Sequence, residues 1–343
     1  MSHLTRKQAV HDWAQSFATP DAAASRKATQ ELFAKDAVFH IVHPWNDLTG
    51  TEAYLDGFVA SLTTAFRGLH RRDDILIGGR FEGADWVATH GNYVGHFGAP
   101  LFGLKPSDRL EYLRFGEFHR FDGDQIVESH IYLDLPQLMI ATGQWPAEFL
   151  SPATQKGYTG FIPGPATQDG LQLHENDPDH SQSTYQLITD MLSGLATKDE
   201  KWRPYWHENM MWYGPAAFGS FVGVDDFAAF QVPFEGAFSF WGGGSSNNGV
   251  TAHFTRFGDG DYACLGGWPS LMAVRAHDFL GQPSRGETLL MRVCDWYRRT
   301  DDLVIENWVI VDIPDALLQM GVDIFAGHHD VAPGPRMTEG TAT

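Results

Sequence analysis

Residues 114–143 read RFGEFHRFDGDQIVESHIYLDLPQLMIATG, and residues 292–321 read RVCDWYRRTDDLVIENWVIVDIPDALLQMG. The two stretches align without a gap. The identical pairs are Arg114/Arg292, Arg120/Arg298, Asp124/Asp302, Glu128/Glu306, Asp134/Asp312, Pro136/Pro314 and Gly143/Gly321. Most other positions exchange like for like. The pattern indicates an internal repeat, and its two copies decide the fold.

A second match lies upstream, between residues 32–54 and residues 205–227. In both, a glycine (Gly50 or Gly223) precedes an apolar-periodic helix. A repeat of this span is a domain, because solenoid repeats are only about 20–50 residues long. We therefore predict one domain over residues 1–143, a linker over 144–181, a second domain over 182–325 and a flexible tail over 326–343.

Helical patterns come first in each copy and strand patterns follow. In the first copy Thr19, Pro20 and Asp21 favour a helix start, with a second helix at Thr51. The predicted strands are 39–42, 73–79, 86–97, 109–121 and 125–133. In the second copy we expect helices at 183–196 and 224–234 and strands at 251–257, 261–268, 287–298 and 303–311. This order predicts an α+β fold: two tandem cone-shaped domains, each a curved antiparallel sheet with helices on one face.

Composition narrows the class of protein. The net charge of −19 repels phosphate backbones, so we expect no nucleic-acid partner. No apolar run is long enough to span a bilayer, and residues 1–17 lack the apolar core of a signal peptide, which favours a cytoplasmic protein without a membrane partner. Cys264 and Cys294, the only two cysteines, are expected in the core.

Two aspartates end the last strand of each copy. Asp134 and Asp312 each stand one residue before a Leu-Pro or Ile-Pro pair. A carboxylate that faces an apolar cavity has a raised pKa and suits proton transfer beside a carbonyl. The alternative is structural, because an Asp before such a turn often caps the following helix, here 135–142.

The sequence resembles the SnoaL-like polyketide cyclases of the nuclear transport factor two-like, or cystatin-like, superfamily. The resemblance is carried by residues 91–143 and by ENWVIVDIPDALLQMG at 306–321. It implies a cone fold, ring closure without metal or organic cofactor, and an acid/base aspartate at the position of Asp134 and Asp312. The family's Glu-x-Trp element matches Glu306 and Trp308, and its Gly-Thr-His element is replaced here by Gly91, Asn92 and Tyr93.

Histidines and aromatic residues supply the remaining candidates. We expect His119 or His130 to serve Asp134 in proton transfer, with His40 as a further candidate. No His-x-His or His-Glu-x-x-His motif occurs, so we predict no metal and no other cofactor. The residues expected to line the pockets are His40, Trp45, Tyr132, Trp212, Tyr213, Asp295 and Trp308.

Three functions fit this pattern. The first is a cofactor-independent enzyme that performs aldol cyclisation, isomerisation or dehydration on an apolar carbonyl metabolite. The second is a non-catalytic module that binds such a metabolite. The third is an interaction scaffold, in which the second copy replaces the partner of a dimer; a homodimer of the whole chain also remains open.

Overall fold

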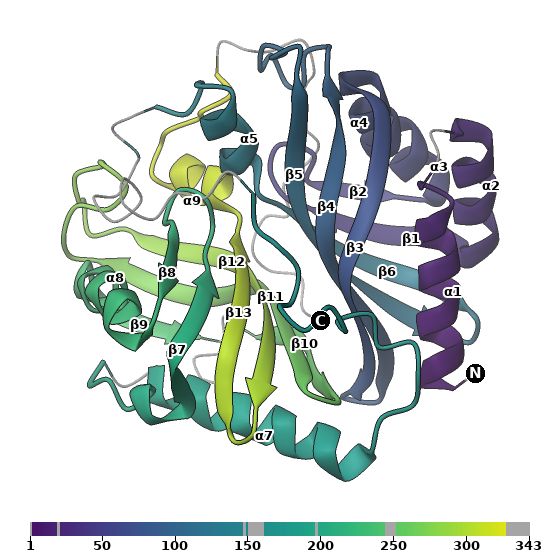
Figure 1. The fold of residues 1–343 in the computed structure, drawn as a ribbon. Coiled ribbons are helices and arrows are strands. Elements are labelled where there is room, and N and C mark those ends of the chain that lie inside the picture. The colour runs from purple at the N-terminus through teal and green to yellow at the C-terminus, as the bar shows by residue number, and fades with distance from the viewer. Residues whose placement is uncertain are drawn as a thin grey trace.

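The computed structural model describes residues 2–18, 21–146, 149, 161–195, 198–243 and 252–326. Two curved sheets face each other, and each carries helices on its outer side (Figure 1). The predicted fold class, α+β with two cone-shaped units, is confirmed. Glu82, Phe102 and Asp108 lie in the loops of the first unit, and their backbone φ angles are positive.

The first half runs from helix α1 to helix α5. Its elements are α1 (His3–Gln15), α2 (Ala22–Leu32), β1 (Phe33–Ile41), β2 (Asp47–Thr49), α3 (Thr51–Ala53), the π-helical turn η1 (Tyr54–Val59), α4 (Ala60–Ala65), β3 (Phe66–Phe81), β4 (Ala84–Phe97), β5 (Leu110–Asp122), β6 (Gln125–Leu133) and α5 (Leu135–Ala141). The tight turn from β5 to β6 uses Gly123 at φ +60°, a conformation that glycine adopts without steric cost.

The second half repeats this order from helix α7 to helix α9. Its elements are α7 (Pro178–Leu195), the 3₁₀ turn η3 (Arg203–Tyr205), β7 (Trp206–Tyr213), β8 (Ser220–Val222), α8 (Val224–Gly236), β9 (Phe238–Gly243), β10 (His253–Asp259), β11 (Tyr262–Arg275), β12 (Thr288–Thr300), β13 (Leu303–Val311) and α9 (Ile313–Gln319).

The two sheets share one strand order. It is β2-β1-β6-β5-β4-β3 in the first and β8-β7-β13-β12-β11-β10 in the second, where β9 also pairs with β11. Neighbouring strands are antiparallel except β1 with β6 and β7 with β13, which are parallel. Each sheet is therefore mixed, because the first strand of each half inserts beside the last.

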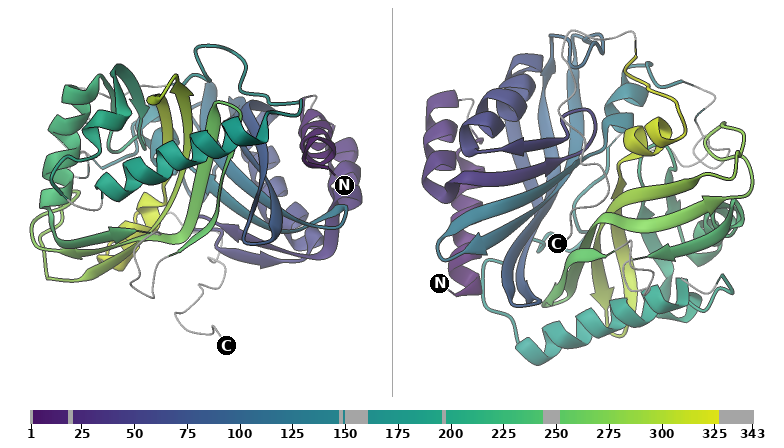
Figure 2. Two further views of the ribbon diagram at one scale, coloured as in Figure 1. Left: turned by 90° about the horizontal axis from the view of Figure 1, so that it is seen from below. Right: turned by 180° about the vertical axis from the view of Figure 1, so that it is seen from behind.

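Helices cover the outer side of each sheet (Figure 2). Helix α1 packs on β3 and α2 on β1, whereas α7 lies along β10 and β11 and α8 lies against β7 and β9. The inner sides of the sheets meet each other. There Trp296 stacks on Phe118 at 4.8 Å between ring centroids, and Phe254 stacks on His130 at 3.6 Å. One close approach is at Gly116, where a Cβ atom would lie 2.5 Å from the Trp296 ring.

Several element predictions differ from the structure at their boundaries. Helix α1 is not predicted, because Arg6 and Lys7 stand on its buried face beside Val10 and Trp13 and leave no clear apolar stripe. The N-cap of α2 is Asp21, which accepts hydrogen bonds from the next turn, and Thr19 and Pro20 lie outside the described residues. Strands β3 and β11 are longer than predicted. The expected tail beyond 326, much of the linker and residues 244–251 also lie outside the described residues.

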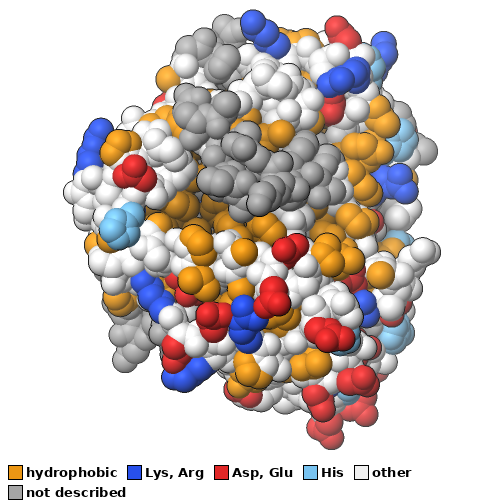
Figure 3. Space-filling view, turned by 60° about the vertical axis from the view of Figure 1, so that its left-hand side comes forward, with side chains coloured by type: hydrophobic (Ala, Val, Ile, Leu, Met, Phe, Trp, Pro, Cys, Tyr) orange, Lys and Arg blue, Asp and Glu red, His pale blue; other side chains and the backbone are white. Residues whose placement is uncertain are grey.

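The surface carries the acidic character of the sequence. On the face shown in Figure 3, acidic side chains gather toward the lower edge and hydrophobic side chains lie nearer the middle. Both cysteines are buried, as expected. Among the described residues, no helix is both long enough and apolar enough to cross a membrane.

Candidate functional site

A cavity opens in the second half between the concave face of the sheet and helices α7 and α8. It offers about 150 Å³, and its wall is mostly apolar. Helix α8 contributes an aromatic stripe at helical spacing, Phe227, Phe230 and Phe234. The lining is completed by Leu192, Leu195, Trp206, Trp212, Pro215, Phe218, Gln231, Trp241, His253, Leu265, Ser270, Leu271, Met291, Val293, Asp295, Tyr297, Asn307, Val309 and Val311.

Asp295 is the one carboxylic acid in the described wall of this cavity. It lies on β12, where Val293 and Tyr297 share its face, and it is 8 % exposed. The amide of Asn307 donates to its Oδ1 at 3.3 Å. Burial raises the pKa of Asp295 to about 7, although hydrogen bonds from Asn307 and Tyr297 offset part of this rise.

Near neutral pH, Asp295 is therefore present in both protonation states, and it can take or give a proton in an apolar space. Within the described chain no Lys or Arg forms an ion pair with it. This is the environment that the sequence predicts for an acid/base group, but it is found at a residue expected only to line a pocket.

His253 is a second polar group of the same wall. Its Nε2 lies 3.0 Å from the hydroxyl oxygen of Ser270, and its Nδ1 has no hydrogen-bond partner in the described part of the chain. Burial, with a contribution from Arg256, lowers the pKa of His253 to about 4. The imidazole is thus neutral at pH 7, and it can hydrogen-bond a polar atom of a ligand without adding charge.

The corresponding acid in the first half is paired with an arginine. Glu117 is the counterpart of Asp295 on β5, but the Arg71 guanidinium lies 2.6 Å from its carboxylate. Burial alone would raise the pKa of Glu117, but Arg71 and His119 outweigh burial and lower it to about 2. Trp13 of α1 covers Arg71 at 4.7 Å from the ring centroid. A buried, fully paired carboxylate of this kind is structural rather than a proton donor or acceptor at neutral pH.

Asp134 lies between the two halves rather than at a cavity wall. Its side chain caps α5 by accepting a hydrogen bond from the backbone N–H of Gln137, and it pairs with Arg114 at 2.7 Å. It also accepts a hydrogen bond from the backbone N–H of Ala216 in the other half, at 3.0 Å. The structural alternative considered for this residue, a helix cap, is the geometry found here.

Asp312 makes the reciprocal contacts. It caps α9 at the Asp315 amide, pairs with Arg292 at 3.1 Å and accepts from the backbone N–H of His43 at 3.0 Å. Burial and the nearby Asp315 raise its pKa. The expectation that Asp134 and Asp312 face a ligand cavity is thus corrected: strand alternation puts both on the inner side of the sheets, whereas the described cavity lies on the outer side.

The other expected residues divide between cavity, interface and core. Trp212 and Asp295 line the cavity. Tyr132, Tyr213 and Trp308 lie on the inner faces: the Tyr132 hydroxyl donates to the Gly267 carbonyl at 2.9 Å, and Tyr213 stacks on Trp308. His119, beside Ser129, and Trp45, against Phe58, belong to the interior of the first half. His40 and His130 lie together on the inner face of the first sheet.

Sequence reasoning misses Gln231, His253, Tyr297 and Asn307 as wall residues. A usable signal is present, because Asn307, Val309 and Val311 alternate with Glu306, Trp308 and Ile310 along β13. The family resemblance points to the face of Asp312, and the cavity lies on the opposite face.

Comparisons with known proteins give structural matches only. No protein-family model and no curated protein matches the sequence. A protein of Jannaschia sp. CCS1 named as a SnoaL-like polyketide cyclase is 20 % identical, covers 40 % of this chain and 94 % of its own, and has a TM-score of 0.34. IdmH of Streptomyces antibioticus, named as a polyketide cyclase, is 18 % identical over 41 % of this chain and 99 % of its own, with a TM-score of 0.33.

A third structure, TsrD of Streptomyces laurentii, is 18 % identical, covers 43 % of this chain and 98 % of its own, and has a TM-score of 0.34. At these identities the likeness concerns the fold alone. Each match takes in nearly all of the other protein and about two-fifths of this one. Over that part, the chain is similar in fold to SnoaL-like polyketide cyclases and other NTF2-like proteins.

Proposed function

We propose that the second half binds a small apolar carbonyl compound and performs cofactor-independent acid/base chemistry on it, with Asp295 as the group that transfers the proton. The single observation that carries this proposal is a buried carboxyl group, without an ion-pair partner in the described chain, in the wall of an otherwise apolar cavity. Aldol cyclisation, isomerisation and dehydration all begin with removal of a proton beside a carbonyl, and they share this requirement.

The cavity sets the size of the substrate. Its volume of about 150 Å³ equals that of an engineered cavity in another protein that binds benzene, so a single ring or a short branched chain fits the described space. The aromatic stripe of α8 favours a flat, apolar body. His253, whose Nδ1 has no hydrogen-bond partner in the described chain, supplies a polar contact for a carbonyl oxygen at the same wall.

In this mechanism the Asp295 carboxylate accepts the proton from the carbon next to the carbonyl group. Negative charge then develops on the carbonyl oxygen, where a hydrogen-bond donor stabilises it. The protonated carboxylic acid, stable in this apolar wall because its pKa is raised, returns the proton to the product. Neither a metal nor an organic cofactor is needed for these steps.

The test uses simple ring ketones as probes, because the natural substrate is unidentified. Cyclohexanone and acetophenone would be incubated with the protein in D₂O, and deuterium incorporation next to the carbonyl would be followed by NMR. We expect faster exchange of the acetophenone methyl protons or the cyclohexanone ring protons than in buffer, and loss of that acceleration by at least about 100-fold in Asp295→Asn.

A second measurement separates catalysis from binding. Saturation-transfer NMR would report whether the same ketones occupy the cavity in Asp295→Asn and in Phe230→Ala. Binding without accelerated exchange in the wild type would contradict the enzymatic proposal and support the alternative of a binding module. Absence of both would favour a scaffold.

We also infer that the two halves are a tandem duplication, with domain units near residues 1–143 and 182–325. The shared strand order and the common spacing of Asp134 and Asp312, Arg114 and Arg292, and Glu117 and Asp295 support this. On this interpretation the ligand cavity belongs to the second unit.

A further inference from the structure

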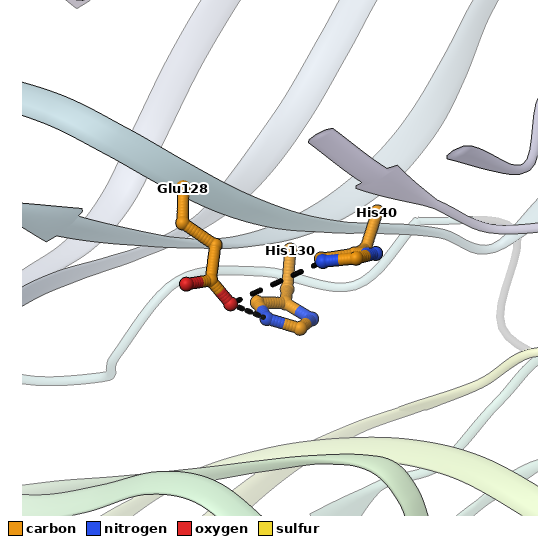
Figure 4. Close-up of side chains that lie close together, drawn as sticks. All are labelled: His40, Glu128 and His130. Atoms are coloured by element: carbon orange, nitrogen blue, oxygen red, sulfur yellow. Dashed lines mark hydrogen bonds and ion pairs between the residues drawn. The ribbon is translucent and has the colours of Figure 1, made fainter. Parts of the chain in front are cut away.

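Two histidines and a glutamate meet on the inner face of the first sheet. His40 comes from β1, whereas Glu128 and His130 are two residues apart on β6 and therefore share a face. The parallel pairing of β1 with β6 places His40 directly beside His130. Figure 4 shows the three side chains projecting from the same side of the sheet toward one another.

The ligand atoms of these residues converge. One atom from each lies within 4.8 Å of the other two. The Oε1 atom of Glu128 lies 2.9 Å from Nε2 of His130 and 4.0 Å from Nε2 of His40. Ligands about 2.1 Å from one tetrahedral ion stand about 3.4 Å apart, so small side-chain rotations suffice to bring all three to bonding distance.

Neighbouring side chains orient His40 and Glu128 for coordination. Nδ1 of His40 lies 2.7 Å from Oδ1 of Asp47, so a proton on Nδ1 leaves the lone pair of Nε2 directed at the cluster. A histidine ligand that donates its other N–H to a carboxylate is the usual outer arrangement of metal sites. Arg120 holds the other oxygen of Glu128, Oε2, at 2.7 Å and leaves Oε1 toward the histidines.

The tautomer of His130 is also free to change. The Nε2 proton of His130 can move to Nδ1, which is buried and has no hydrogen-bond partner in the described chain.

The second half gives an internal comparison. There the equivalent glutamate, Glu306, keeps its arginine partner Arg298, but Tyr213 and Trp308 take the places of the two histidines and stack on each other. The glutamate–arginine pair is thus part of the shared framework. The histidines are an addition of the first half alone, and the framework does not require them.

We propose that His40, Glu128 and His130 form a binding site for a borderline divalent transition-metal ion of the Zn²⁺ type, with Asp47 as a positioning residue. A set of two imidazoles and one carboxylate binds such ions in preference to Mg²⁺ or Ca²⁺, which favour oxygen ligands. Three protein ligands leave a coordination position for water or a small ligand. This site is separate from the cavity of Asp295, and neither proposal depends on the other.

The test is a titration of the full, tag-free, chelator-treated protein with Zn²⁺ and with Co²⁺. We expect one equivalent of Zn²⁺ by calorimetry, the strong visible absorption of four- or five-coordinate Co²⁺, and a metal-induced rise in Tm. His40→Asn and Glu128→Gln should each remove the stoichiometric site. Asp47→Asn should weaken it by about 10–100-fold while leaving the Tm of the metal-free protein unchanged.

The matched control is His180→Asn, which removes an exposed histidine that pairs with Asp261 at 2.6 Å. It should bind Zn²⁺ as the wild type does. A Zn²⁺ soak with anomalous diffraction should place the ion between His40, Glu128 and His130. Retention of the bound equivalent in His40→Asn and Glu128→Gln, an ion located at His180, or no stoichiometric binding in the wild type would overturn the proposal.

Discussion

Glu117 and Asp295 occupy equivalent strand positions in the two halves, but their carboxyl groups have different partners. Glu117 meets the buried guanidinium of Arg71, and its charge is compensated. Asp295 meets an amide and a phenol, and its charge is not compensated. The proton-transfer capability proposed for the second half therefore comes from the lack of an arginine beside one side chain, not from a different backbone.

The raised pKa of Asp295 predicts a pH-dependent stability. The folded state holds a proton on this carboxyl group up to about pH 7, whereas an unfolded Asp releases it near about 3.9. Between these values the folded state binds more protons, so the free energy of unfolding falls as pH rises from about 4 to about 7. Asp312, whose pKa is also raised, adds to this fall.

Urea denaturation at several pH values would measure this effect. Asp295→Asn should flatten the slope by up to about 1.4 kcal/mol per pH unit, and leave the part that belongs to Asp312. Asp124→Asn is the control, because Asp124 is an exposed acid in the turn between β5 and β6, away from the cavity. Equal slopes in wild type and Asp295→Asn would show that Asp295 is ionised throughout this range.

At the scale of elements, the last strand of each half delivers an aspartate to the start of a short helix. Both aspartates cap their helices, but their arginine partners differ in burial. The side chain of Arg114 is 0 % exposed, and that of Arg292 is 11 % exposed and also lies 3.8 Å from Asp315. The two caps therefore have similar geometry, but Asp134 compensates the charge of a fully buried arginine, whereas Asp312 compensates that of a partly exposed arginine with a second carboxylate nearby.

Replacing these two aspartates by asparagine should lower the free energy of unfolding by different amounts. Asp134→Asn leaves the buried Arg114 without a carboxylate, and we expect a loss of about 3–5 kcal/mol in the free energy of unfolding. Asp312→Asn should cost clearly less, because Arg292 keeps Asp315 and some contact with water. Chemical denaturation of both variants would measure the difference, and equal losses would contradict this account.

The elements themselves are largely predictable. Strands β6 and β13 have the bounds that the sequence predicts, because each is a run of alternating residues closed by a turn and a proline. Which side of each strand points to the cavity and which to the other sheet is not predictable in the same way. Both sides of β13 are apolar, so alternation alone does not tell which side meets a cavity and which meets the other sheet.

The site is only partly predictable for the same reason. Asp295 and Trp212 are among the expected pocket residues, but the sequence gives more weight to Asp134 and Asp312. The cluster of His40 with His130 depends on a parallel pairing between strands distant in sequence, and the local sequence of either strand does not show it. Local sequence patterns thus predict the helices and strands, whereas the residues that meet in a site depend on the pairing of strands distant in sequence.

At the scale of the whole molecule, the two sheets close against each other over an aromatic seam. Gly116 lies under the Trp296 ring, and the Cys294 sulfur would lie 3.2 Å from a Cβ atom added at Gly116. Phe118 and His90 pack against the same ring. The distance between the halves at this point is set by the absence of a side chain.

Gly116→Ala should therefore destabilise the molecule by about 1–3 kcal/mol, because the added methyl group forces the tryptophan or the sheets to shift. Gly236→Ala is the matched control: Gly236 ends helix α8, and a Cβ atom there meets nothing within 4 Å. Thermal and chemical unfolding would compare the two. A Gly116→Ala variant as stable as Gly236→Ala would mean that the seam adjusts freely.

The crossed hydrogen bonds of Asp134 and Asp312 have a consequence for engineering. Each half borrows a backbone amide, at Ala216 or at His43, from a loop of the other to complete the start of its own last helix. A half transplanted alone loses this donor, and water has to replace it at the start of the last helix. A chimera or minimal version of this protein that is meant to keep this contact must therefore carry over the donor loop as well as the unit it serves.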